Sequence, residues 1–119
     1  MLDHVSLKVA DYDRAEAFYD IALSPLGLRR LMGGVGFAGY GDTRPFFWIG
    51  VGGRPGSAHV AFVAPDRATV DAFHKAAVGA GGTDNGAPGI RAHYHPDYYG
   101  AIVLDPDGHN IEAVCHAPG

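Results

Sequence analysis

Residues 58–73, AHVAFVAPDRATVDAF, repeat a pattern that is already present in residues 3–18, DHVSLKVADYDRAEAF. The two stretches align without a gap, so that His4 falls on His59 and each aspartate after the apolar run falls on the other. Matching residues at matching places indicate one supersecondary unit that the chain uses twice.

Each copy predicts a strand followed by a helix. In the first copy the apolar residues Val5, Leu7 and Val9 alternate with polar ones, which is the period of a half-buried strand. Asp11 and Asp66 follow the two strands and suit a helix N-cap, because a carboxylate accepts hydrogen bonds from the free N–H groups of the first turn. A histidine therefore opens each strand, on the face opposite the apolar one.

Glycine and proline divide the rest of the chain into short elements. We predict helices over residues 11–23 and 66–78. The predicted strands are residues 2–9, 28–32, 35–40, 46–51, 57–64, 90–94, 99–104 and 110–116, with a glycine-rich join over 52–56 and a sharp turn over 105–108. This order describes two βαβββ units, in residues of about 1–52 and 57–116.

A βαβββ unit has an open, curved sheet with one helix on its outer face, so it cannot close a core alone. We expect an α+β fold in which two such units form a single domain, residues 1–119. Their sheets would curve into a cup with the helices outside. The side chains opposite the helices would then line the cup.

Composition excludes several classes of function. The formal net charge of −4 and the lack of a Lys/Arg cluster argue against a nucleic-acid partner. No apolar run approaches the roughly 20 residues of a membrane span, and the first residues lack the pattern of a signal peptide. The single cysteine, Cys115, cannot make an internal disulfide, which favours the cytoplasm.

Three polar side chains are expected on the inner face of the cup. Strand parity places His4 and His59 there, and the last strand, whose alternate residues are apolar from Ile111 on, places Glu112 with them. Two imidazoles and one carboxylate bind a divalent cation and leave positions open to substrate. A histidine near a strand start is more often a hydrogen-bonded surface residue, but the matching places of His4 and His59 in the repeat favour the metal site.

Three motifs, DHVSLKVADYDRAEAFY, AHVAFVAPDRATVDAF and DPDGHNIEAV, carry a resemblance to a known family. The whole chain resembles the vicinal oxygen chelate superfamily, which includes glyoxalase I, extradiol dioxygenases, methylmalonyl-CoA epimerase, fosfomycin-resistance transferases and bleomycin-resistance proteins. The resemblance implies that His4, His59 and Glu112 stand at the family's ligand positions, with Fe, Mn, Zn or Ni as the divalent cofactor. It also implies a homodimer, although the cup is built within one chain in some members and between two in others.

One position departs from the glyoxalase pattern. Glyoxalase I and the epimerase carry a fourth ligand on the strand that ends the first unit, and Trp48 takes that place here. Tryptophan cannot bind the metal, so the remaining ligand set is more similar to those of extradiol dioxygenases and fosfomycin transferases. Trp48 is expected to form a pocket wall, with simple packing as the alternative.

Residues 93–99, HYHPDYY, are the other candidate for the site. We expect this segment to line the substrate pocket with Tyr94, His95, Tyr98 and Tyr99. His95 would serve as an acid or base beside Glu112. The alternative is that the tyrosines cover the cup or pack at a dimer contact. Surface positions are expected for the other histidines of the second half, His74, His109 and His116.

These features predict a metal-dependent enzyme that acts on a small substrate with two adjacent oxygens. A dioxygenase-like reaction fits the ligand count best, and a glyoxalase-like lyase or isomerase comes next. The rival is a non-catalytic protein that sequesters a planar compound in the aromatic cup, as bleomycin-resistance relatives do.

Overall fold

The computed structural model describes residues 3–52 and 58–119, which form two βαβββ modules. The first module consists of β1 (Val5–Val9), α1 (Tyr12–Ala22), the 3₁₀ turn η1 (Ser24–Leu26), β2 (Arg29–Gly34), β3 (Phe37–Gly41) and β4 (Pro45–Val51). The second consists of β5 (His59–Val63), α2 (Arg67–Gly79), β6 (Thr83–Ile90), β7 (Tyr99–Leu104) and β8 (Asn110–Cys115). The predicted α+β fold is confirmed, whereas most of the predicted join over 52–56 lies outside the described residues.

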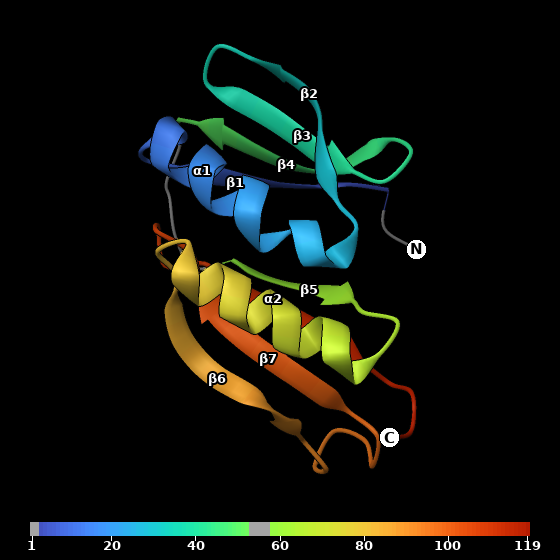
Figure 1. Cartoon of the computed structure of the whole chain (residues 1–119). Coiled ribbons are helices and arrows are strands. Elements are labelled where there is room, and N and C mark those ends of the chain that lie inside the picture. The colour runs from blue at the N-terminus through green and yellow to red at the C-terminus, as the bar shows by residue number, and fades with distance from the viewer. Residues whose placement is uncertain (1–2, 53–57) are drawn as a thin grey trace.

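The two modules have the same sheet topology. Their strand orders are β1-β4-β3-β2 and β5-β8-β7-β6, so the first and last strands of each module are neighbours. These neighbours run parallel, and the other pairs run antiparallel. The helices α1 and α2 lie side by side on one side of the molecule, with the sheets behind them (Figure 1). No helix among the described residues is long and apolar enough to cross a membrane.

Both helices begin at the aspartates that the sequence indicates. The Asp11 carboxylate accepts a hydrogen bond from the Arg14 N–H at 3.1 Å, and that of Asp66 accepts one from the Thr69 N–H at 2.7 Å. The hydrogen bonds from the Thr69 side chain and backbone lower the pKa of Asp66. The N-caps therefore determine where each helix begins after its strand.

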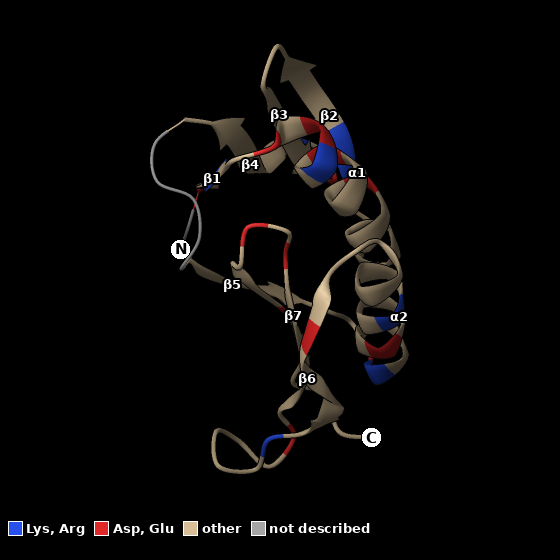
Figure 2. Cartoon of the chain, turned by 90° about the vertical axis from the view of Figure 1, so that its left-hand side faces the viewer, with Lys and Arg blue, Asp and Glu red and all other residues tan. Residues whose placement is uncertain are grey.

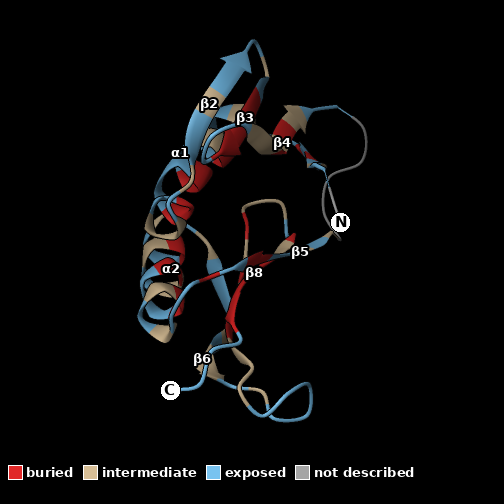
Figure 3. Ribbon diagram, turned by 90° about the vertical axis from the view of Figure 1, so that its right-hand side faces the viewer, coloured by how far each residue is buried: buried red, intermediate tan, exposed pale blue. Residues whose placement is uncertain are grey.

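The apolar core lies between the helices and the sheets and is continuous across both modules (Figure 3). Phe47 and Ile49 of β4 are fully buried, as the alternation of this strand predicts. The ring of Phe47 meets that of Phe62 on β5 with centroids 5.1 Å apart, in an edge-to-face arrangement. Aromatic packing thus joins the last strand of one module to the first strand of the other.

A polar network, buried at Tyr19 and Asp105, also joins the modules. The Tyr19 hydroxyl on α1 donates to Asp105 at 2.6 Å, and the Ala10 N–H donates to Asp107 at 2.9 Å. In Figure 2 the acidic turn between β7 and β8, drawn in red, reaches toward the first module. Burial, followed by the charge of Asp105, raises the pKa of Tyr19 well above its ordinary value, so this phenol remains a donor.

His109 belongs to this network, and its predicted surface position is wrong. Its side chain is 2% exposed. Its Nδ1 accepts a hydrogen bond from the Ala58 N–H, so Nε2 carries the proton and donates to the Lys8 carbonyl at 2.9 Å. A neutral imidazole of one tautomer therefore bridges β1 to the segment before β5.

Replacing Tyr19 with phenylalanine tests this network. The change keeps the ring but removes the donor to a buried carboxylate, so we expect a loss of about 1.5–3 kcal/mol in unfolding free energy. Urea unfolding measures this loss. Tyr12→Phe is the control, because the Tyr12 hydroxyl lies at the less buried surface of α1 and its loss is expected to cost less. Equal losses in the two variants would contradict a special role for the buried contact.

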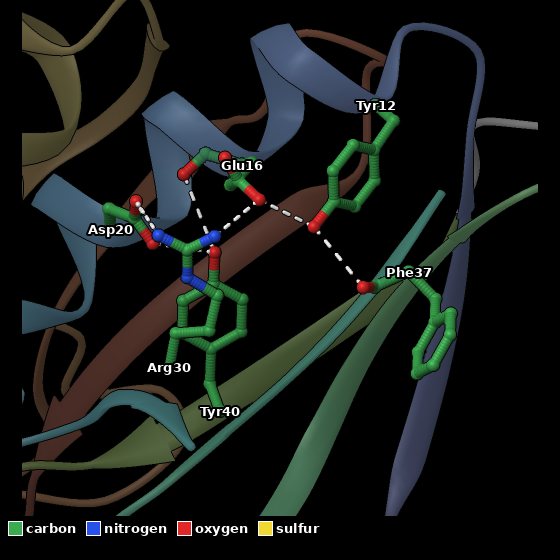
Figure 4. Close-up of polar contacts among 6 residues, drawn as sticks. All are labelled: Tyr12, Glu16, Asp20, Arg30, Phe37 and Tyr40. Atoms are coloured by element: carbon green, nitrogen blue, oxygen red, sulfur yellow. Dashed lines mark hydrogen bonds and ion pairs between the residues drawn. The ribbon is translucent and has the colours of Figure 1, made fainter. Parts of the chain in front are cut away.

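A second polar cluster links β2 and β3 of the first module to α1 (Figure 4). Arg30 on β2 contacts Glu16 at 2.5 Å and Asp20 at 3.2 Å, and the Tyr40 hydroxyl donates to Asp20 at 2.9 Å. The ion pairs are partly exposed, so each contributes little alone. Their combined effect is to hold the edge strand β2 against the helix.

One predicted strand is wrong. The sequence predicts a strand over 90–94, whereas β6 occupies Thr83–Ile90 and residues 91–98 form turns. Gly86 and Pro88 made this stretch resemble a loop. β6 is an edge strand with register shifts next to Gly86, and an edge strand tolerates proline and glycine.

Candidate metal site

His59 and Glu112 meet on the open face of the second sheet. In the parallel pair of β5 and β8, Ala61 is the register partner of Glu112, and His59 lies two residues earlier on the same face as Ala61. The small side chain of Ala61 leaves room, and the His59 Nε2 lies 2.9 Å from the Glu112 Oε1. The sequence-predicted pair is therefore brought into direct contact.

The two members of this pair differ sharply in exposure. The side chain of Glu112 is 5% exposed and that of His59 is 54% exposed. The neighbouring β-sheet residues Ala61, Ile102 and Val114 are apolar. A carboxylate that is buried among apolar neighbours and bonded to an exposed histidine differs from a surface ion pair and is a candidate for a functional site.

Tyr98 supplies a further contact to the same carboxylate. Its hydroxyl donates to the Glu112 Oε2, so each oxygen of the carboxylate has one partner. Burial, followed by the hydrogen bond to Glu112, raises the pKa of Tyr98 to about 12. The phenol is therefore protonated near neutral pH and acts as the donor.

His4 lies apart from this pair within one chain. It precedes β1, and its Nδ1 lies 2.8 Å from an Asp3 oxygen, while Arg44 pairs with the other oxygen of Asp3 at 3.0 Å. Across residues 3–52 and 58–119, no three His, Cys, Asp or Glu side chains come close enough to hold a metal ion. A single chain thus brings together His59 and Glu112 but not His4.

The spacing of the His59–Glu112 pair suits a divalent cation. Imidazole nitrogen and carboxylate oxygen bind such ions at about 2.0–2.2 Å, so two ligands at right angles are separated by about 3 Å. The observed separation of Nε2 and Oε1 is 2.9 Å. The two groups share a hydrogen bond at this distance, and the same spacing is compatible with two neighbouring ligands of one ion.

The remaining predicted pocket residues do not gather at one place. Trp48 is partly buried, lines a pocket beside His4 and stacks on Phe37 with ring centroids 6.3 Å apart. Tyr94 is 67% exposed, and its ring lies 5.0 Å from that of Tyr98. These positions put Trp48 on the open face of the first module and Tyr94 against the ring of Tyr98, in the turns before β7.

His95 and Tyr99 point elsewhere. The His95 Nδ1 accepts the Asp97 N–H, and no contact between His95 and Glu112 is seen among the described residues. The Tyr99 hydroxyl donates to Asp71 of α2 at 2.6 Å, which places it on the helix side of the sheet. The structure therefore gathers Tyr98, and not Tyr99, at the carboxylate.

Sequence reasoning missed two neighbours of Tyr98. His116 is exposed, as expected, and it also packs edge-to-face on the Tyr98 ring at 5.3 Å. Gly100 lies beside Glu112 across the ladder, where a β-carbon would stand 3.0 Å from the Glu112 Oε2. The antiparallel pairing of β7 and β8 causes both contacts, and no local motif signals that pairing.

A family model describes nearly the entire chain. The Glyoxalase/Bleomycin resistance protein/Dioxygenase superfamily matches residues 1–113. The chain belongs to this superfamily. Members of the superfamily often are enzymes and typically use divalent metals. The resemblance drawn from the three sequence motifs is confirmed.

Comparison with solved structures gives proteins of the same fold. A glyoxalase/bleomycin resistance protein from Albidiferax ferrireducens T118 is 31% identical, with a TM-score of 0.85 over 97% of this chain and 98% of that one. The lactoylglutathione lyase of Agrobacterium tumefaciens is 19% identical, with a TM-score of 0.72 over 97% and 92%. The fosfomycin resistance protein FosX of Mesorhizobium loti is 18% identical, with a TM-score of 0.71 over 97% and 91%. The last two likenesses show the fold alone, and no curated protein matches the chain.

Proposed function

We propose that this superfamily member is a metal-dependent enzyme that acts on a small substrate with two adjacent oxygens. The observation that carries the proposal is the His59–Glu112 pair, with its donor atoms 2.9 Å apart on an open sheet face. We infer that His4 is the third ligand. Three such ligands hold a divalent ion and leave the remaining positions open to substrate.

We further propose that a second copy of the chain supplies His4, since one chain does not bring it to the pair. The open faces of both modules carry exposed apolar side chains, among them Phe37 at 43% and Val63 at 78%. Apolar surface of this kind favours association. A homodimer would cover these faces and complete two equal sites, one at each His59–Glu112 pair.

The residues around the pair suit substrate binding next to an ion. A bound divalent ion polarises neighbouring oxygens and stabilises the negative charge that develops on them. His59 leaves the site accessible from solvent, and the exposed ring of Tyr94 can stack on a planar substrate. A dioxygenase-like reaction remains our first proposal because Trp48 stands where a fourth ligand would be needed for glyoxalase chemistry, and a lyase or isomerase is second.

The rival proposal is sequestration of a planar compound without catalysis. It is favoured by the aromatic side chains of Trp48, Tyr94 and Tyr98 and by the separation of His4 from the other ligands in one chain. We propose a cytoplasmic location in both cases, which the single cysteine favours.

Metal analysis separates the two proposals. We expect protein purified without chelators to contain, or to take up from Fe²⁺, Mn²⁺, Zn²⁺ or Ni²⁺, one equivalent of metal per chain. The loaded protein is then screened with catechols, 2-oxoaldehyde thiol adducts and thiol-acceptor antibiotics. Protein that takes up none of the four metals but binds a planar compound would overturn the enzyme proposal in favour of sequestration.

A further inference from the structure

We propose that Tyr98 is a positioning residue for the metal site: its hydroxyl holds one oxygen of Glu112 so that only the other oxygen is presented to the ion. This inference rests on the proposed function and assigns Tyr98 a role distinct from lining a pocket. The proposal is based on the two different partners of the Glu112 carboxylate. Its Oε2 accepts a hydrogen bond from the Tyr98 hydroxyl, and its Oε1 faces His59.

The Tyr98 ring is held in place from two sides. The Tyr94 ring lies 5.0 Å away, and the His116 ring packs edge-to-face at 5.3 Å. The Tyr98 N–H donates to the His95 carbonyl at 3.0 Å, and its own carbonyl accepts the Arg91 N–H at 2.7 Å. Backbone and ring contacts together fix where the hydroxyl points, which is what a positioning role requires.

Gly100 is the second observation that supports this role. A β-carbon at Gly100 would lie 3.0 Å from the Glu112 Oε2 and 3.2 Å from the Tyr98 Cε1. Its backbone φ is not in the left-handed region, so turn geometry does not require glycine here. The missing side chain instead leaves room for the contact between the phenol and the carboxylate.

The chemical consequence concerns how the carboxylate binds. A free carboxylate can offer both oxygens to one ion and can rotate between the two modes. With Oε2 accepting the hydrogen bond from the Tyr98 hydroxyl, Glu112 would offer Oε1 alone, and a coordination position would stay open for substrate. Hydrogen-bond partners of metal ligands commonly change metal affinity by about 10–100-fold when they are removed.

The test compares Tyr98→Phe with Tyr12→Phe in the full chain. Tyr98→Phe keeps the ring and removes only the hydroxyl, whereas Tyr12→Phe removes a hydroxyl that donates to the other glutamate, Glu16 on α1, away from the site. We expect Co²⁺ to bind about 10–100-fold more weakly to Tyr98→Phe and with unchanged affinity to Tyr12→Phe. Wild-type Co²⁺ affinity in Tyr98→Phe would overturn the positioning role.

The visible absorption of bound Co²⁺ provides a readout that a merely structural role would not change. Release of Oε2 raises the number of oxygens that Glu112 can offer, so we expect Tyr98→Phe at saturating Co²⁺ to show the weaker band of a higher coordination number. An unchanged band would mean that Glu112 binds in the same way without the hydroxyl, against the proposal.

A metal-free measurement separates this proposal from the proposed function. Unfolding midpoints of Tyr98→Phe, Glu112→Ala and the double variant are expected to be non-additive, because each single change removes the one hydrogen bond that the two side chains share. Wild-type protein that takes up no Co²⁺ would defeat the proposed function even if this coupling is present. Additive midpoints would show that the contact itself is absent and defeat the positioning role alone.

Discussion

Glu112→Ala is expected to abolish binding of divalent metal while the fold remains intact. Glu112 contributes the only carboxylate of the proposed ligand set, and two imidazoles alone hold such an ion weakly. The substitution leaves the Tyr98 hydroxyl without its acceptor, so a modest loss of stability accompanies the loss of metal. Elemental analysis after metal loading and desalting measures the stoichiometry, and circular dichroism checks the fold.

The chain offers a matched control for this experiment. Its only other glutamate is Glu16, which lies on α1 and pairs with Arg30 away from the site. Glu16→Gln is expected to retain full metal content, and Glu112→Gln is expected to lose it as Glu112→Ala does. One equivalent of metal remaining in Glu112→Ala would show that the ligand set is wrong.

Phe47→Ala is expected to cost about 3–5 kcal/mol in unfolding free energy, which is a large part of the total for a domain of this size. The Phe47 side chain is fully buried, and its ring meets those of Tyr19 at 5.0 Å and Phe62 at 5.1 Å. Truncation opens a cavity at the junction of the modules. Urea unfolding followed by Trp48 fluorescence and by far-ultraviolet circular dichroism measures the loss.

The matched control is Ile21→Ala, which truncates an apolar side chain on α1 that is 52% exposed and lies away from the open sheet faces. We expect this variant to lose less than about 1 kcal/mol. The two probes should shift together in Phe47→Ala, because the core is continuous across the modules. A shift of the Trp48 signal alone would indicate that the first module unfolds independently and would contradict a shared core.

Local patterns in the sequence were sufficient to predict most of the fold. Alternation assigned Phe47 and Ile49 to the buried face, and Asp11 and Asp66 marked the helix starts, because strand parity and N-cap chemistry depend only on nearby residues. The strand over residues 99–104 was predicted with its observed bounds. The repeat supplied the architecture, since two equal units that cannot close alone must pack on each other.

Features that depend on distant contacts could not be predicted in the same way. His109 follows a turn and resembles a surface residue, yet the Lys8 carbonyl and the Ala58 N–H enclose its ring. Tyr98 could be suspected of lining the pocket, but its bond to Glu112 depends on the pairing of β7 with β8. The position of His4 relative to the pair depends on how the modules, or two chains, are arranged.

The parallel pairing of the first and last strands of each module constrains the order in which the protein can fold during synthesis. Val5 is paired with Phe47, and His59 with Asn110, so neither opening strand has its hydrogen-bonding neighbour until the closing one has been synthesised. During translation β1 therefore stays unpaired until β4 has been made, and β5 stays unpaired until β8 has been made. Such long-range closure slows folding and leaves nascent edges exposed to unwanted association.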